Sequence, residues 1–117
     1  MACEVEYTDE FEEWWDRLSP AEQGAPHAHV RLLAEYGVTL RFPYSSGVAT
    51  SAHSQMRELR IQHGGRPYRV LYAFDPRRTA ILLIGGDKTG DDRRYETMVP
   101  VADAIFNRHL AELEKED

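Results

Sequence analysis

Two arginines on adjacent predicted strands are the residues best suited to chemistry on a charged group. Arg60 and Arg69 each lie between two apolar residues. Since side chains alternate between the faces of a strand, each arginine is expected on the face opposite its apolar neighbours. The Gly64-Gly65 pair between them predicts a tight hairpin, which would place both arginines in one patch of sheet. Arginine binds phosphate bidentately, so this patch is a candidate phosphodiester site.

Further polar residues are predicted to reach the same patch from the loop after the third strand of the meander. Lys88 lies at the end of that strand, and Arg93, Arg94 and Tyr95 lie just before the last predicted helix. Together these groups would surround a phosphodiester with charge and with proton donors. The alternative is that they are solvent-exposed cations of the kind that protect sheet edges against aggregation.

Metal and nucleotide chemistry find no support in the sequence. The chain lacks the glycine-rich phosphate loops, HExxH and paired CxxC motifs. Among five histidines, His27 and His29 are two residues apart, and on a helix their side chains would diverge by about 200°. His109 falls on an apolar helical stripe, where a packed histidine is the simpler interpretation. We therefore expect no metal site and no cofactor.

The charge of the chain is unevenly distributed. The net charge of −6 combines −7 over residues 1–26, +5 over residues 27–95 and −4 over residues 96–117. Ten of the eleven cations in the central segment are arginines. An anion-binding centre between two acidic ends fits this skew, while solvated acidic helix faces remain the simpler explanation of the ends.

The periodicity predicts an α+β domain with an antiparallel sheet. A short strand precedes two helices that form a helical hairpin, and three strands then form a meander before a C-terminal helix, in the order β-α-α-β-β-β-α. We expect one domain over residues 1–117. The predicted strands are residues 5–7, 56–62, 67–74 and 79–84. The first helix is predicted to start at Thr8 or Asp9, the second to run from Ser19-Pro20 to Tyr36, and the last to begin between residues 96 and 99. Residues 38–55 and 85–94 are predicted loops.

The sequence favours a cytoplasmic protein without a membrane partner. Cys3 is the only cysteine, so an intramolecular disulfide is impossible. No apolar run approaches the roughly 18 residues that a membrane span needs, and the acidic N-terminus lacks a signal-peptide core.

The central and C-terminal parts of the chain resemble the HigB-like toxins of the RelE superfamily. The resemblance rests on the hairpin sequence MRELRIQ…GGRPYRVLY, the turn DPRR, the strand and loop AILLIGGDK, and the segment YE followed by MVPVAD. It covers residues 55–113 closely and the N-terminal helices loosely. The element order predicted above also fits the RelE-like fold.

The resemblance implies a toxin of a type II toxin–antitoxin system that is held inactive by a partner antitoxin, commonly a small helix-turn-helix protein of the HigA type. It also implies metal-independent cleavage of messenger RNA, usually on the ribosome. By position, the catalytic set would be Arg60, Arg69, Lys88 and Tyr95. Further RNA contacts would come from the neighbouring basic residues Arg57, Arg66, Arg93 and Arg94.

Two positions depart from the RelE pattern. Glu58 lies where RelE carries a second strand lysine, and Thr89 lies where RelE carries an arginine; Arg66, Arg93 or Arg94 would supply the missing charge. Two alternatives therefore stay open. The chain could be a non-catalytic module that binds RNA or protein, or a RelE-fold toxin that acts on a non-RNA target.

Overall fold

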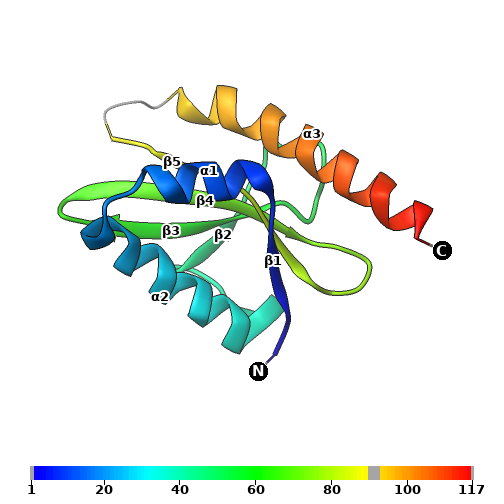
Figure 1. Cartoon of the computed structure of the whole chain (residues 1–117), viewed down its shortest axis with the longest axis horizontal. Helices are drawn as coiled ribbons and strands as arrows, with labels where there is room; N and C mark the ends of the chain where they lie inside the picture. Colours follow the sequence, from blue (N-terminus) through cyan, green and yellow to red (C-terminus); the bar gives the residue numbers. More distant parts are fainter. Residues whose placement is uncertain (1, 90–92, 117) are drawn as a thin grey trace.

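The chain folds around one five-stranded sheet with helices on both faces (Figure 1). The computed structural model describes residues 2–89 and 93–116. The strand order across the sheet is β1-β5-β4-β3-β2. The strands are β1 (Val5–Tyr7), β2 (Ser45–Gly47), β3 (Arg57–His63), β4 (Arg66–Phe74) and β5 (Ala80–Asp87), and the helices are α1 (Asp9–Arg17), α2 (Pro20–Tyr36), the 3-10 turn η1 (Gly37–Thr39) and α3 (Arg94–Lys115).

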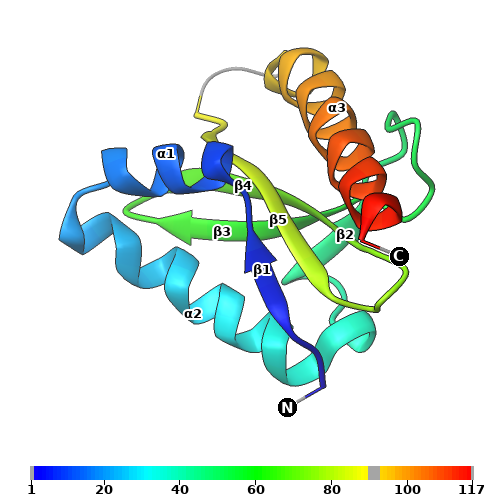
Figure 2. The same cartoon turned by 45° about the vertical axis from the view of Figure 1, so that its right-hand side comes forward.

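The two faces of the sheet carry separate apolar cores. On one face, α1 and α2 cover a cluster that includes Phe11, Trp14, Leu33 and Tyr68. On the other face, α3 covers a second cluster centred on Phe106. Figure 2 shows α3 on one side of the sheet, with α1 and α2 on the opposite side. Residues on β3 and β4 therefore face either the helical hairpin or α3 according to their parity.

Local signals explain where the first two helices begin. The Thr8 hydroxyl accepts a hydrogen bond from the Phe11 N–H at the start of α1. Ser19 and Glu22 form a reciprocal capping box at the start of α2, with Pro20 in its first turn. These caps satisfy backbone donors that a helix N-terminus otherwise leaves unpaired, so the short connection between α1 and α2 is well defined.

The hairpin of β3 and β4 has the predicted register. Arg60 lies directly opposite Arg69, and the connecting Gly64 and Gly65 both have positive φ, at 58° and 78°. Two consecutive positive φ values are the requirement of a type I′ turn, which glycine meets without strain. The turn therefore brings the two arginines together, as the sequence predicted.

The α+β class is confirmed, and the order of elements agrees with the prediction apart from four details. The predicted loop 38–55 contains β2, an edge strand paired with β3. The sheet is not wholly antiparallel, because β1 pairs with β5 in parallel. The last helix begins at Arg94 rather than between 96 and 99, and β5 extends to Asp87. Part of the predicted loop 85–94 lies outside the described residues.

The strand β2 escaped prediction because its sequence, Ser-Ser-Gly, has low strand propensity. Tertiary contacts hold it instead. The Ser45 side chain is fully buried, and its hydroxyl lies 2.6 Å from the Tyr72 hydroxyl. Nε of Arg57 donates to the same serine oxygen at 3.1 Å. This polar network replaces the apolar contacts that a typical edge strand would make.

Side-chain contacts fix α3 to the rest of the fold. A carboxylate oxygen of Asp75, in the β4–β5 turn, lies 2.9 Å from Nε2 of His109 on α3. The guanidinium of Arg108 makes two hydrogen bonds to Glu10 of α1, both 2.8 Å long. Asp103 accepts hydrogen bonds from the Ser51 hydroxyl and the Ala52 N–H.

No helix in the described part of the chain is long and apolar enough to span a membrane.

Candidate active site

A buried carboxylate lies at the centre of the polar cluster on the α3 face of the sheet. Glu58 is 5% exposed. One of its oxygens lies 3.1 Å from Nε of Arg69 and 3.4 Å from Nη1 of Arg60. The Tyr95 hydroxyl donates to both oxygens at 2.6 Å. Glu58 is thus the common partner of three of the four residues predicted to be catalytic.

The two arginines differ in how far they reach solvent. The side chain of Arg69 is only 7% exposed, and its Nη1 donates to the Tyr68 carbonyl at 3.0 Å. Its buried Nε, although close to Glu58, makes no hydrogen bond of acceptable geometry to it. The side chain of Arg60 is 33% exposed. Arg60 is therefore the arginine that a ligand would meet first, while Arg69 lies beneath the carboxylate.

The α3 helix delivers Tyr95 into the cluster from its first turn. Burial, followed by the hydrogen bond to Glu58 and that carboxylate's negative charge, raises the pKa of Tyr95 to about 12. The phenol is consequently protonated across the physiological range. Tyr95 can donate a hydrogen bond or a proton, but as placed here it is not a base.

The fourth predicted residue reaches the cluster through the tyrosine ring. The ammonium nitrogen of Lys88 lies 4.3 Å from the centroid of the Tyr95 ring, a cation–π contact. Lys88 follows β5 directly, and its N–H donates to the Pro67 carbonyl at 2.8 Å. The structure therefore brings Arg60, Arg69, Lys88 and Tyr95 together.

The four residues predicted as further RNA contacts do not all share this face. Arg57 bonds Ser45 and the Leu40 carbonyl, on the face that the helical hairpin covers. Strand alternation places it opposite Glu58 and Arg60, so we remove Arg57 from the set. Arg66 is exposed at the hairpin end, with Nε 3.6 Å from a carboxylate oxygen of Asp87. Arg93 and Arg94 lie at the start of α3, close to the cluster in sequence.

Glu58 is the functional candidate that sequence reasoning did not include. We predicted it as a departure from the RelE pattern that lowers the local charge. The signal available was its parity with Arg60: both lie on the same face of β3, two residues apart. Two cations beside one carboxylate lower the cost of burying its charge.

The cluster combines the groups needed for an acid–base reaction on a phosphodiester. A carboxylate, a protonated phenol, two guanidiniums and an ammonium lie within one chain of contacts. Cations stabilise charge that develops on phosphate oxygens, and the other two groups can accept and donate protons. The described residues contain no group of three or more acidic, histidine or cysteine side chains placed to hold a metal ion.

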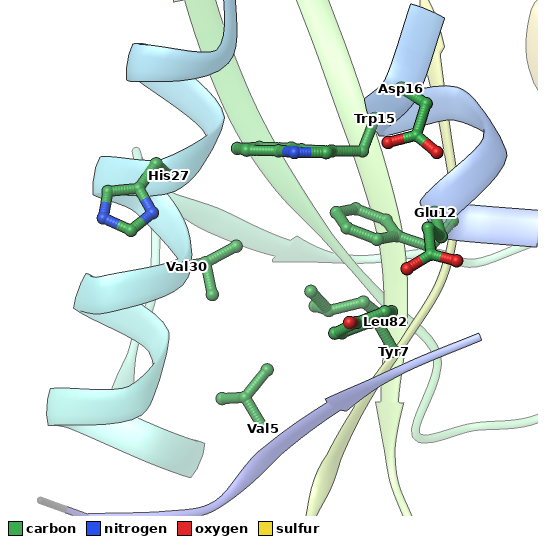
Figure 3. Close-up of a pocket in the computed structure, with 9 residues that line it drawn as sticks. Val5, Tyr7, Glu12, Trp15, Asp16, His27, Val30 and Leu82 are labelled. Carbon is green, nitrogen blue, oxygen red and sulfur yellow. The ribbon is translucent and has the colours of Figure 1, made fainter. Parts of the chain in front are cut away.

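A cavity of about 460 Å³ lies elsewhere, between β1, α1 and α2 (Figure 3). Trp15, Val30 and Leu82 form apolar walls, and the carboxylates of Glu12 and Asp16 lie at its margin. These carboxylates would repel a phosphate. The cavity is therefore a poor candidate for an RNA site, despite its size.

Comparison with known proteins agrees with this picture. Residues 13–107 match the family described as phage-derived protein Gp49-like. The chain is 39% identical over 103 residues to "Putative toxin HigB3" of Mycobacterium tuberculosis, in a match that covers 87% of this chain and 89% of the relative. The chain belongs to the family of HigB-like toxins. A second relative from the same organism, "Putative toxin HigB2", is 37% identical over 103 residues, 86% of this chain and 51% of that protein.

Solved structures place this HigB-like chain in the RelE fold. A chain of the archaeal RelE–RelB complex from Pyrococcus horikoshii superposes with a TM-score of 0.56 at 16% identity, over 77% of this chain and 99% of that one. A mutant of E. coli toxin RelE in the free state gives a TM-score of 0.58 at 11% identity, over 92% and 98%. The predicted RelE-like fold is confirmed.

Proposed function

We propose that this HigB-like chain is a metal-independent endoribonuclease. It cleaves messenger RNA on the ribosome and thereby inhibits translation. The observation that carries the proposal is the contact of Glu58 with Arg60, Arg69 and Tyr95 on one face of the sheet. RNA supplies its own nucleophile, the 2′-hydroxyl. The protein needs only to position the phosphate, stabilise charge and move protons.

In the proposed reaction, the 2′-oxygen attacks the adjacent phosphorus, and the bond from phosphorus to the 5′-oxygen breaks. The products are a 2′,3′-cyclic phosphate and a 5′-hydroxyl. Glu58 accepts the proton of the 2′-hydroxyl, and the protonated phenol of Tyr95 or the ammonium of Lys88 supplies a proton to the departing 5′-oxygen. Arg60 and Lys88 contact the phosphate from the solvent side. Arg69 pairs with the buried carboxylate of Glu58.

The test is the mapping of 5′ ends after a short induction of the chain in bacteria. New 5′ ends within translated regions are expected with the wild-type chain. Arg60→Ala should lower their yield about 100-fold, since loss of one charge-stabilising donor often costs that much. Arg78→Ala, a change in the β4–β5 turn away from the cluster, is the matched control and should cut as the wild type does.

Two other results would redirect the assignment. Growth arrest without new 5′ ends would favour a toxin that acts on a non-RNA target. A folded chain that neither arrests growth nor cuts RNA, but binds a partner, would be a non-catalytic binding module.

We also propose an antitoxin partner of the helix-turn-helix type. One structural neighbour was solved as a RelE–RelB complex, which supports an antitoxin partner for this chain. In this chain, α1 carries five acidic residues and one arginine, and its carboxylates border the apolar cavity in Figure 3. A DNA-binding antitoxin carries basic surface, so α1 is the face that complements it in charge.

A further inference from the structure

Exposed apolar side chains concentrate in one short segment at the edge of the sheet. In the described part of the chain, four of the six exposed large apolar residues fall between positions 36 and 44. Phe42 is the most exposed, at 69%. An exposed cluster of this kind usually marks a binding surface. These four residues are Tyr36, Val38, Phe42 and Tyr44.

The Phe42 ring is joined to the proposed catalytic cluster through Arg60. The central guanidinium carbon of Arg60 lies 5.1 Å from the centroid of the ring. Nη1 of the same side chain lies 3.4 Å from Glu58. The exposed ring and the buried carboxylate are thus separated by a single guanidinium group.

The backbone around Phe42 is held in place. The Tyr44 and Ser45 N–H groups both donate to the Arg41 carbonyl, at 3.0 and 3.2 Å, which closes a turn around the ring. The Arg60 N–H donates to the Tyr44 carbonyl at 2.9 Å, which ties this turn to β3. Because the backbone that carries the Phe42 ring is already ordered, little conformational freedom of this turn is lost when a ligand contacts the ring.

The space beside the ring has the size and chemistry of a base site. A hollow of about 270 Å³ is lined there by Leu32, Tyr36, Leu40, Arg41, Phe42 and Tyr44, together with Thr39. Among the described residues, no acidic one lines this hollow, unlike the cavity between α1 and α2. Unpaired RNA bases stack on aromatic rings and on arginine planes, and the exposed Arg41 adds a cation for the backbone.

We propose that Phe42 stacks against the base of a nucleotide adjoining the scissile phosphate, while Arg60 binds the phosphate between that base and Glu58. The inference rests on the proposed ribonuclease function and gives it a substrate contact. Phe42 is a positioning residue, because it acts on the base and not on the reacting atoms. Since every base has a stacking face, this contact tolerates different sequences.

The test separates binding from cleavage. The probe is a single-stranded RNA oligonucleotide that is 2′-O-methylated throughout, so that no 2′-hydroxyl can attack, and that carries one 2-aminopurine, whose fluorescence falls on stacking. The wild-type chain and Phe42→Trp are expected to bind it with quenching. Phe42→Leu keeps an apolar side chain but removes the ring, and should weaken binding about five- to 150-fold, the range for loss of one stacked base.

Tyr7→Leu is the matched control, because Tyr7 is an aromatic residue, 60% exposed, at the opposite edge of the sheet. It should bind like the wild type. Equal binding by Phe42→Leu and the wild type would overturn the proposal and assign the segment to a protein partner. A wild-type chain that does not bind the oligonucleotide would overturn it as well. Binding through Phe42 without cleavage of unmodified RNA would instead uphold the stacking and contradict the nuclease.

Discussion

The hydroxyl of Tyr95 joins α3 to the proposed site through its hydrogen bonds to Glu58. Tyr95→Phe removes only this oxygen and leaves the ring that Lys88 contacts. We expect the rate of RNA cleavage to fall about 100-fold or more, since a positioned general acid usually contributes at least that much to the rate. The folded structure should change little. The measurement is the rate of 5′-end appearance, with Tyr7→Phe, a change at an exposed tyrosine on β1 at the other edge of the sheet, as the control. A Tyr95→Phe rate within a few-fold of the wild type would contradict the assignment.

The same residue gives a prediction for alkaline pH. Its pKa of about 12 exceeds that of an ordinary tyrosine, about 10, because burial and Glu58 favour the neutral phenol. A group whose pKa is raised by folding stabilises the fold fully below the unfolded value, and this contribution is lost as pH rises through the folded value. The stability that Tyr95 adds should therefore be constant up to about pH 10 and disappear between about pH 10 and 12. Urea unfolding of the wild type and of Tyr95→Phe should converge over that window.

At the scale of elements, one glycine allows α1 to approach the sheet. A Cβ at Gly85 in β5 would clash with the ring of Trp14. Gly85→Ala should therefore destabilise the fold by about 1–3 kcal/mol, because the new Cβ would overlap the buried Trp14 ring and force it or the strand to shift. Gly24→Ala in α2, where nothing lies within 4 Å of the new Cβ, should have the opposite sign, about 0.5–1 kcal/mol stabilising. Thermal unfolding of both variants measures the difference.

The attachment of α3 depends on a buried carboxylate outside the proposed site. Asp75 is 5% exposed, and burial alone would raise the pKa of its carboxyl. Hydrogen bonds from His109, Arg77 and backbone N–H groups outweigh that effect, so the pKa lies below its usual value. Asp75→Asn should lower the free energy of unfolding by about 1–3 kcal/mol at neutral pH, because the buried carboxylate that accepts hydrogen bonds from Arg77 and from the Arg77 and Thr79 N–H groups is lost.

The pH dependence of Asp75 runs opposite to that of Tyr95. A lowered pKa gives stability that is present above about pH 4 and is lost as pH falls further through the folded value. The stabilities of the wild type and Asp75→Asn should consequently approach each other in acid. A difference that stays constant down to about pH 2 would show that Asp75 does not act through its charge.

At the scale of the whole molecule, the acidic and basic regions are segregated by element. Reversal of Glu12 and Asp16 to lysine changes the margin of the cavity in Figure 3 and not the Glu58 cluster. The double variant should keep cleaving RNA but bind the co-expressed helix-turn-helix antitoxin at least about tenfold more weakly, since like charges would then meet. Titration calorimetry of the purified pair checks this. Unchanged affinity would place the antitoxin on another face.

The sequence predicted the parts of the site that lie on regular elements. Strand parity and the Gly64-Gly65 turn placed Arg60 and Arg69 together, because alternation is a local property of a strand. The role of Glu58 was missed because its partner Tyr95 comes from α3, across 37 residues of chain. The same limit applied to β2, which depends on the buried Ser45–Tyr72 contact rather than on its own propensity. Arg57 was misplaced because parity was not applied to it.

The parallel pairing of β1 with β5 has a consequence for synthesis. Val5 lies opposite Ala80, so the first strand to leave the ribosome must wait for the last strand before it can pair. The Glu58 cluster waits longer still, since it needs Tyr95 from the helix that follows. Contacts this distant in sequence form late in folding. A nascent chain of this protein therefore lacks the assembled Glu58 cluster until α3 has been synthesised and packed against the sheet.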